Sequence, residues 1–298
     1  MMTLVGLAAA FFFFLVQGNF VVCFQGARGI KGRRTTLPLL QMTAAIQTVT
    51  VGSSENPYEI QLQHKIFLGD LQPLQSTNGR EDLTGLKFWP QSSTALLKKL
   101  EKNNPLRKKK SDDCCSILVL GSGCGLLGIG LAVLYPNSRV ILTDAPVDFT
   151  TAADKDVEEN SEPTTQSTMD WLEGNVERNQ HLVQDRVSVA PLLWGNEAHQ
   201  QAISNNLLLN SSQGQGQIDL IVGSELLYNN EASFRGLLDT LLYFLGDNGN
   251  ATILLVYRQR KLGESRFFDM AEDYFSIETT RIGRKSDGIF LAELSLLP

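Results

Sequence analysis

The sequence predicts an α/β domain with a mainly parallel sheet and helices on both of its faces. Strand-like and helix-like segments alternate through most of the chain, as they do in doubly wound folds. A short apolar run, Ile117–Leu120, is followed by closely spaced glycines and an apolar helical stretch, which is typical of a strand that leads into a nucleotide-binding turn. Two strand-like segments, 275–279 and 290–294, close the chain.

The segments expected to be strands share short apolar or alternating runs, often β-branched. They are 58–63, with 66–68 as its partner or continuation, 117–120, 139–143, 187–193, 218–222, 252–257, 275–279 and 290–294. The segments expected to be helices follow a proline or a glycine-rich turn, or repeat apolar residues at helical spacing. They are 88–100, a helix that ends at 134, 171–179, 234–245 and 267–273.

Two polar stretches interrupt this alternation. Residues 148–170 hold seven acidic residues, one lysine and no sustained apolar period, which predicts an acidic inserted loop. Residues 196–217 become rich in Asn, Gln, Ser and Gly toward their end, which predicts the end of a helix followed by a loop.

Length and composition favour one catalytic domain, placed at residues 55–298. With 298 residues and 43% apolar content, the chain can bury a large core without disulfides or metals. Its four cysteines, of which Cys114 and Cys115 are adjacent, show no C-x-x-C spacing, and its three histidines are far apart. These spacings argue against a structural zinc site and a disulfide framework, and we expect no metal.

The first 54 residues contain no acidic residue, and residues 1–27 contain no charged one. The apolar run 4–16 fits the core of a signal peptide, with Val21 and Cys23 at the −3 and −1 positions of a cleavage site. The basic, acid-free stretch that follows is typical of transit peptides. Residues 1–54 therefore resemble the bipartite targeting leaders of algae with secondary plastids. We expect an organelle, foremost the plastid; the secretory pathway and the cytoplasm remain open.

The net charge of the chain limits the classes of partner that we expect it to bind. The formal net charge is −6, and removal of the four cations of the leader leaves 22 basic and 32 acidic residues, or −10. An acidic domain binds nucleic acid poorly, because that affinity depends on Lys and Arg contacts to phosphate. We expect a basic, lysine-bearing protein as substrate, no nucleic acid, no stable membrane association once the leader is removed, and a monomer.

Several candidate site residues follow predicted strands, where ligands bind in open α/β sheets. Asp144 comes 23 positions after Gly121, where a carboxylate can accept hydrogen bonds from both ribose hydroxyls. Trp194 can pack on an adenine face, and Trp89 can wall the same pocket. The stretch 224–228 puts a carboxylate and a phenol beside the reactive end of the cofactor. The glycines alone fit either S-adenosylmethionine (SAM) or a dinucleotide.

Taken together, these motifs resemble those of the methyltransferase-like seven-β-strand protein lysine methyltransferases, from about Tyr58 to the C-terminus. The residues that carry the resemblance are Trp89, the stretch 120–129, Thr143-Asp144, Asn175 and Asn179, 193–195 and 223–228. The resemblance implies a Rossmann-like, seven-stranded, mostly parallel sheet with an antiparallel C-terminal strand, and SAM as methyl donor. The cofactor site it implies consists of Trp89, Gly121, Ser122, Gly123, Gly125, Asp144, Trp194 and Ser224.

The expected reaction is transfer of a methyl group from SAM to a lysine side chain of a protein, with Glu225 and Tyr228 as catalytic residues. The lysine must present a neutral amine, although its usual pKa is about 10.4; Glu225 can hold and orient the ammonium, and Tyr228 can line the channel. The sequence departs from the resemblance at Val119, where many members carry an acid, and at Glu225, where the family motif has Asp. The Asn/Asp-Pro-Pro-Tyr motif of amide and nucleobase methyltransferases is missing, which argues against adenine and glutamine as acceptors.

Three other functions stay open. The altered Glu225 motif is compatible with a SAM enzyme for a small molecule or another side chain. Val119 is compatible with a catalytically silent scaffold that retains the fold and the cofactor. An NAD-dependent oxidoreductase would account for the glycine spacing but leaves Trp194 and the 225–228 motif unexplained.

Overall fold

The computed structural model describes most of the catalytic domain predicted from the sequence. The described residues are 42–53, 57–67, 86, 88–103, 105–108, 114–151, 164–209, 217–228, 231–246, 251–260 and 263–298. All of them belong to one unit, Leu40–Pro298. The signal-like and basic parts of the expected leader, up to residue 41, lie outside the described residues.

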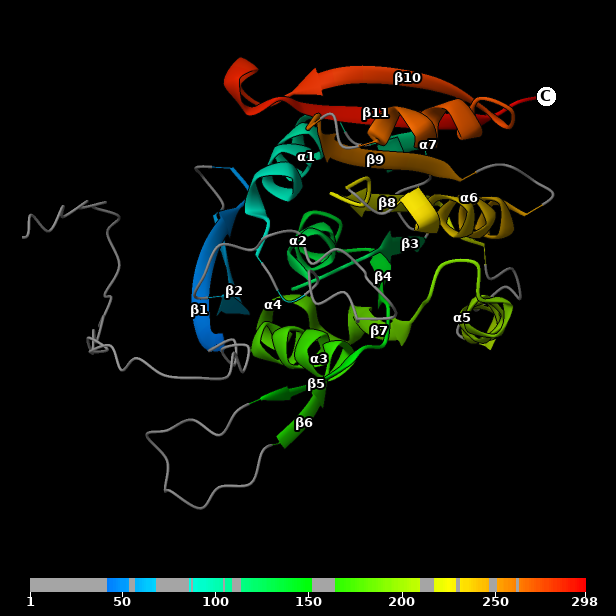
Figure 1. Cartoon of the computed structure of the whole chain (residues 1–298). Helices are drawn as coiled ribbons and strands as arrows, with labels where there is room; N and C mark the ends of the chain where they lie inside the picture. The colour runs from blue at the N-terminus through cyan, green and yellow to red at the C-terminus, as the bar shows by residue number, and fades with distance from the viewer. Residues whose placement is uncertain are drawn as a thin grey trace, which may run out of the picture. The chain divides into compact units, whose positions relative to one another are not determined.

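A seven-stranded sheet forms the centre of this unit (Figure 1). In spatial order its strands are β10 (Phe275–Ile282), β11 (Ile289–Leu296), β9 (Thr252–Arg258), β8 (Leu220–Ser224), β3 (Cys115–Leu120), β4 (Ser138–Asp144) and β7 (Val187–Pro191). The five strands from β9 to β7 are parallel, and β11 is antiparallel to both of its neighbours. The predicted fold class is confirmed. The chain leaves β3 toward β4 on one side and later returns to β8 on the other, which makes the end of β3 the topological switch point.

Helices cover both faces of the sheet because β3 is apolar toward both sides. Ile117 and Val119 pack with α1 (Pro90–Lys102), α2 (Leu126–Leu134) and α3 (Thr168–Arg178) on one face. Leu118 and Leu120 pack with α5 (Glu197–Leu209), α6 (Glu231–Leu245) and α7 (Glu264–Ala271) on the other. The short helix α4 (Gln180–Val183) and three 3₁₀ turns, Pro105–Lys108, Gln184–Arg186 and Lys285–Asp287, complete the helical elements of the described residues.

Helix α2 starts at the glycine-rich turn and is buried on almost every side. It lies against β4, α1 and the N-terminal hairpin, which explains why it is apolar all round rather than amphipathic. Two glycines permit the close approach: a Cβ atom at Gly128 would lie 1.8 Å from Leu142 Cδ2, and one at Gly130 would lie 2.6 Å from Leu97 Cδ1.

The expected boundary of the leader at residue 54 is corrected by strand β1 (Met42–Val51). This strand pairs antiparallel with β2 (Tyr58–Phe67) over its whole length, and Val51 is buried in the core. The absence of acidic residues suggested a leader, but a strand rich in Thr, Val and Ala is equally free of them. Residues 66 and 67 continue β2 and do not form its partner.

Two asparagines of α3 attach this hairpin to the domain. The Asn179 side chain accepts from Gln61 N at 2.9 Å and donates to Gln61 O at 2.7 Å. Asn175 does the same with Gln63, at 2.7 and 3.0 Å, and also donates to Cys124 O at 3.0 Å. Both amides are completely buried. Each forms with β2 the pair of hydrogen bonds that a residue of a neighbouring strand would form. Asn175 thus connects the hairpin directly to the glycine-rich turn.

The two polar stretches are more ordered than predicted. Strands β5 (Asp148–Thr151) and β6 (Thr164–Ser167) pair antiparallel, and α3 begins at Thr168 with a capping box formed by Ser167 and Asp170. The predicted acidic loop 148–170 is therefore ordered at both ends, while 152–163 lie outside the described residues. In the second stretch, Glu197–Leu209 forms the helix α5, whose few buried side chains left only a weak apolar period.

Candidate active site

A pocket lies at the switch point, beside the carboxyl ends of β3 and β8. It is lined by Phe88, Trp89, Ser93, Val119, Gly121, Ser122, Gly123, Cys124, Leu126, Leu127 and Ser224. The structure thus brings together five of the residues expected from the sequence, which are Trp89, Gly121, Ser122, Gly123 and Ser224. The other expected residues lie around this pocket or behind it.

The glycine-rich turn presents its backbone to the pocket. Gly121, Gly123 and Gly125 have φ angles of 55°, 53° and 89°, a region that side chains disfavour. Gly125 also precedes the first turn of α2. It belongs to the glycine-rich turn but is not among the described residues that line the pocket. A Cβ atom at Gly121 would lie 2.5 Å from Leu226 Cδ2, so this approach requires glycine.

The end of β4 holds the turn in place. Ser122 N donates to Thr143 O at 2.8 Å, and Thr143 N donates to Ser122 Oγ at 3.0 Å. Gly123 N donates to Asp144 Oδ2 at 2.6 Å, while Ala145 N donates to Asp144 Oδ1 at 2.8 Å. These two hydrogen bonds orient the Asp144 carboxylate beside Gly123, which lines the pocket. Burial, and then the negative charge of Asp144, raises the pKa of the Cys124 thiol to about 12, so this pocket residue is a neutral thiol.

Trp194 is not among the described residues that line the pocket, but it lies beside one of them. Its ring is adjacent to Gly121, since a Cβ atom there would lie 3.5 Å from Trp194 Cζ2, and it packs with the core residues of the α6 face. The following Gly195 has a φ of 78° and donates to Thr240 Oγ1 at 2.9 Å. A Cβ atom at Gly236 would lie 2.7 Å from Trp194 O, so the Trp-Gly pair is a close contact between the β7 end and α6.

Glu225 is buried, with 8% of its surface exposed, and it has two side-chain partners. Ser92 Oγ donates to Glu225 Oε1, and Arg260 Nη1 lies 2.5 Å from Glu225 Oε2. The neighbouring Ser224 Oγ accepts from Ser93 Oγ at 3.0 Å. Tyr228 is half-buried three positions further on, and neither it nor Glu225 is among the described residues that line the pocket.

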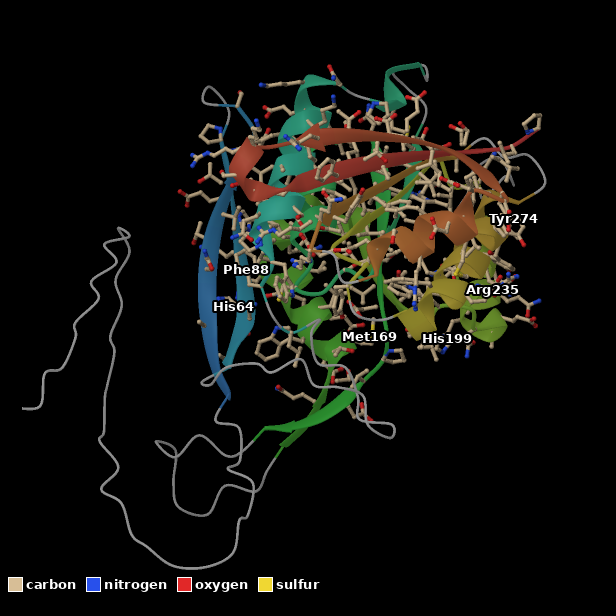
Figure 2. The ribbon with its side chains drawn as sticks, turned by 45° about the horizontal axis from the view of Figure 1, so that its top comes forward. His64, Phe88, Met169, His199, Arg235 and Tyr274 are labelled. Atoms are coloured by element: carbon tan, nitrogen blue, oxygen red, sulfur yellow. The ribbon has the colours of Figure 1, made fainter. Side chains whose placement is uncertain are left out.

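The hairpin reaches the same wall. His64 of β2 stacks on Phe88, with ring centroids 5.3 Å apart and planes inclined by 25° (Figure 2). Phe88 lines the pocket beside Trp89. A segment assigned from the sequence partly to the leader and partly to a strand at 58–63, with 66–68 as its partner or continuation, therefore supports the site.

Sequence reasoning missed several residues of the site. Phe88 and Ser93 flank the predicted Trp89, and Leu126 and Leu127 follow the turn; adjacency to a predicted residue was the available signal. Arg260 follows β9 at the edge where ligands bind, and this position was the only signal for it. Within the described residues, no group of three or more His, Cys, Asp and Glu side chains is placed to hold a metal ion. None of the helices among them is long and apolar enough to cross a membrane.

The pocket has the features that SAM requires. A glycine-rich turn lies beside a carboxylate at the end of the next strand, and the rest of the lining is apolar and aromatic with a few hydroxyls. Such a lining, with few polar groups among apolar ones, is typical of small-molecule sites. Gly121, Ser122, Gly123, Trp89 and Ser224 would contact the cofactor directly.

Comparisons with known proteins agree with this geometry. The family model described as lysine methyltransferase matches residues 70–173 and 163–274. A UPF0665 family protein of Schizosaccharomyces pombe is 26% identical over 205 residues, which cover 65% of this chain and 52% of that protein. Protein N-lysine methyltransferase METTL21A of Mus musculus is 30% identical over 174 residues, covering 58% and 63%; that of Danio rerio is 28% identical over 171 residues, covering 57% and 62%. The matches span less than two thirds of each of these relatives.

Proposed function

We propose, because the chain belongs to the lysine methyltransferase family, that it transfers a methyl group to a lysine side chain of a protein. SAM is the methyl donor of this family. The observation that supports the proposal most is the pocket at the switch point, where the glycine-rich turn 121–123 adjoins the oriented carboxylate of Asp144. Two relatives whose names specify protein lysine as the acceptor add to it.

The residues of the pocket bind and orient rather than react. When bound, SAM supplies a methyl group on a sulfonium, which an amine can attack in line. The protein must align the two groups, and alignment alone can supply several kcal/mol of the barrier. Trp89 and the turn would fix one side of the cofactor. The apolar side chains of Val119, Leu126 and Leu127 would keep water from the methyl group.

The acceptor amine must lose a proton before it attacks. Its usual pKa is about 10.4, so at neutral pH the neutral form costs roughly 4 to 5 kcal/mol unless the site lowers the pKa. We propose that Glu225 and Tyr228 act on this side of the site, with Glu225 attracting the ammonium. Because Ser92 and Arg260 already hold the Glu225 carboxylate, it would act as part of a pair and not as an isolated base.

Radiolabelled methyl transfer from SAM into cell extracts tests this function. Label on a lysine of a protein band, identified by mass spectrometry, would support it. Label confined to small molecules, or to another side chain, would support the other enzymatic function. Binding of SAM in calorimetry without any transfer would indicate a silent scaffold.

We also propose the class of partner and the compartment. The net charge of −10 without the leader favours a basic, lysine-bearing protein over nucleic acid. The domain would work as a monomer without a stable membrane attachment. The acid-free leader favours an organelle, foremost the plastid. A fluorescent fusion of residues 1–41 should enter an organelle, and a diffuse cytosolic signal would contradict this.

A further inference from the structure

Three elements bring a charged cluster to the edge of the pocket. Trp89 and Ser92 lie at the start of α1, Glu225 follows β8, and Arg260 follows β9. Arg260 Nη1 lies 2.5 Å from Glu225 Oε2, and Ser92 Oγ donates to the other carboxylate oxygen. The Glu225 side chain has 8% of its surface exposed and the Arg260 side chain 24%, so this ion pair is largely withdrawn from solvent.

The same guanidinium lies over the pocket residue Trp89. The Arg260 Cζ atom is 5.7 Å from the centre of the indole ring. Trp89 is 38% exposed and precedes a helix without any side-chain cap. A cation above an aromatic face is attracted to it, most strongly when water is excluded. Arg260 therefore contacts the wall of the pocket and the buried carboxylate at once.

Backbone contacts hold both charged residues in place. Arg260 N donates to the buried Glu264 Oε1 at 2.6 Å, and Glu225 N donates to Val256 O at 2.8 Å. Glu225 also has a φ of 61°. A side chain in this region costs free energy and is retained where its surroundings determine it, commonly at functional sites.

We infer that Arg260 is a positioning residue of the cofactor pocket, which holds Trp89 against the bound cofactor and is itself held by Glu225. The inference rests on the proposed function of the pocket as the SAM site. It adds a second task to Glu225, which anchors the guanidinium in addition to facing the acceptor. SAM affinity consequently depends on two residues that do not line the pocket.

Titration calorimetry with SAM on the full chain tests the inference. Arg260→Met should weaken SAM binding by about tenfold, the effect of a partly desolvated cation on an indole. Arg260→Lys should bind with intermediate affinity, because it keeps the charge but loses the planar fork that stacks and pairs. The matched control is Arg258→Met: Arg258 is the last residue of β9 and also reaches α1, but its Nη2 donates to the neutral Gln91 at 3.1 Å. The SAM affinity of this control variant should stay within about twofold of wild type.

A double variant separates positioning from folding. Arg260→Met alone leaves the buried Glu225 carboxylate without its cation, which destabilises proteins strongly. Glu225→Gln together with Arg260→Met removes both charges, so the midpoint of thermal unfolding should return toward that of wild type. SAM affinity should nevertheless stay about tenfold low, because Trp89 still lacks its cation.

The outcomes are distinct. Wild-type SAM affinity in the folded double variant, or equal affinities for Arg260→Met and Arg258→Met, would overturn the role of Arg260 and leave the proposed function intact. Failure of the wild-type protein to bind SAM would overturn the proposed function and this inference together. Weak binding by Arg260→Met and by the double variant, with normal binding by Arg258→Met, supports the inference.

Discussion

Asp144 fixes the glycine-rich turn, and we propose that it also binds the cofactor. Its two oxygens accept from Gly123 N and Ala145 N, so it fixes the turn before any cofactor arrives. Asp144→Ala should therefore weaken SAM binding at least tenfold, or about 1.4 kcal/mol, through loss of hydrogen bonds to a charged acceptor. Asp144→Asn should be milder, since one acceptor oxygen remains.

Calorimetry checks this prediction, with Asp148→Ala as the control, because Asp148 is exposed at the start of β5. Unchanged SAM affinity in a folded Asp144→Ala protein would remove Asp144 from the site.

Cys124 predicts how stability depends on alkaline pH. Burial raises its pKa to about 12 in the folded protein, whereas an unfolded cysteine ionises near about 8.5. The unfolded chain thus loses a proton that the folded protein keeps. Stability is unaffected below the unfolded pKa and falls as pH rises above it, by about 1.4 kcal/mol per pH unit until the folded pKa is reached.

Urea unfolding under reducing conditions at pH 8 and pH 10 measures the effect. Cys124→Ala should show a smaller loss of stability over this range than wild type, while Cys114→Ala should not, because Cys114 is exposed. Equal losses in wild type and Cys124→Ala would show that other groups, such as Tyr135 with its raised pKa, cause the loss of stability at alkaline pH.

At the level of elements, two helical glycines should respond in opposite directions to the same substitution. A Cβ atom at Gly128 in α2 would lie 1.8 Å from Leu142 Cδ2, whereas one at Gly174 in α3 would meet nothing within 4 Å. Gly128→Ala should lower the free energy of unfolding by about 1 to 3 kcal/mol through overpacking. Gly174→Ala should raise it by up to about 1 kcal/mol, because alanine favours the helix.

Urea titration of both variants provides the comparison. A neutral Gly128→Ala would mean that α2 can shift away from β4, and that the tight contact between them is not required.

The elements with strong patterns could be predicted from the sequence, and those stabilised by distant partners could not. The apolar strands and the leucine-rich α6 carry their own signal. Strand β1 depends on pairing with β2, and α5 contributes only a few buried side chains, among them Ile203 and Leu207. Neither has a local signal that separates it from a leader or a polar loop.

The same distinction applies to the site. Gly121 follows β3, and Asp144 and Ser224 end β4 and β8, at spacings that a sequence can show. Gly121 and Ser224 line the pocket, and Asp144 accepts from the lining residue Gly123. Arg260 contacts Glu225 only because β8 and β9 are neighbours. The sequence near residue 260 has no pattern that predicts an ion pair. The packing of Trp194 beside Gly121 depends on how the β7 end meets α6, which the sequence does not show.

Considered as a whole, the domain begins earlier than its sequence pattern suggests. The hairpin β1–β2 is attached to α3 by Asn175 and Asn179 and touches the pocket wall through His64 and Phe88. Asn175 also holds Cys124 O in the turn. Changes in the hairpin should therefore reach the cofactor site, although β1 itself lies far from the pocket in sequence.

Two truncations test where the domain starts. Removal of residues 1–41 keeps β1 and should leave SAM affinity within about twofold of the full chain, since basic, acid-free leaders have no packed face.

Removal of residues 1–54 deletes β1, exposes the paired edge of β2 and takes Val51 from the core. Loss of one buried valine costs about 1.5 to 3 kcal/mol, so the midpoint of thermal unfolding should fall by at least about 3 °C. SAM binding should weaken with it, because the hairpin holds the turn. If both truncated proteins match the full chain, β1 contributes nothing to the domain; if the shorter truncation already loses SAM binding, the segment before Met42 belongs to the domain as well.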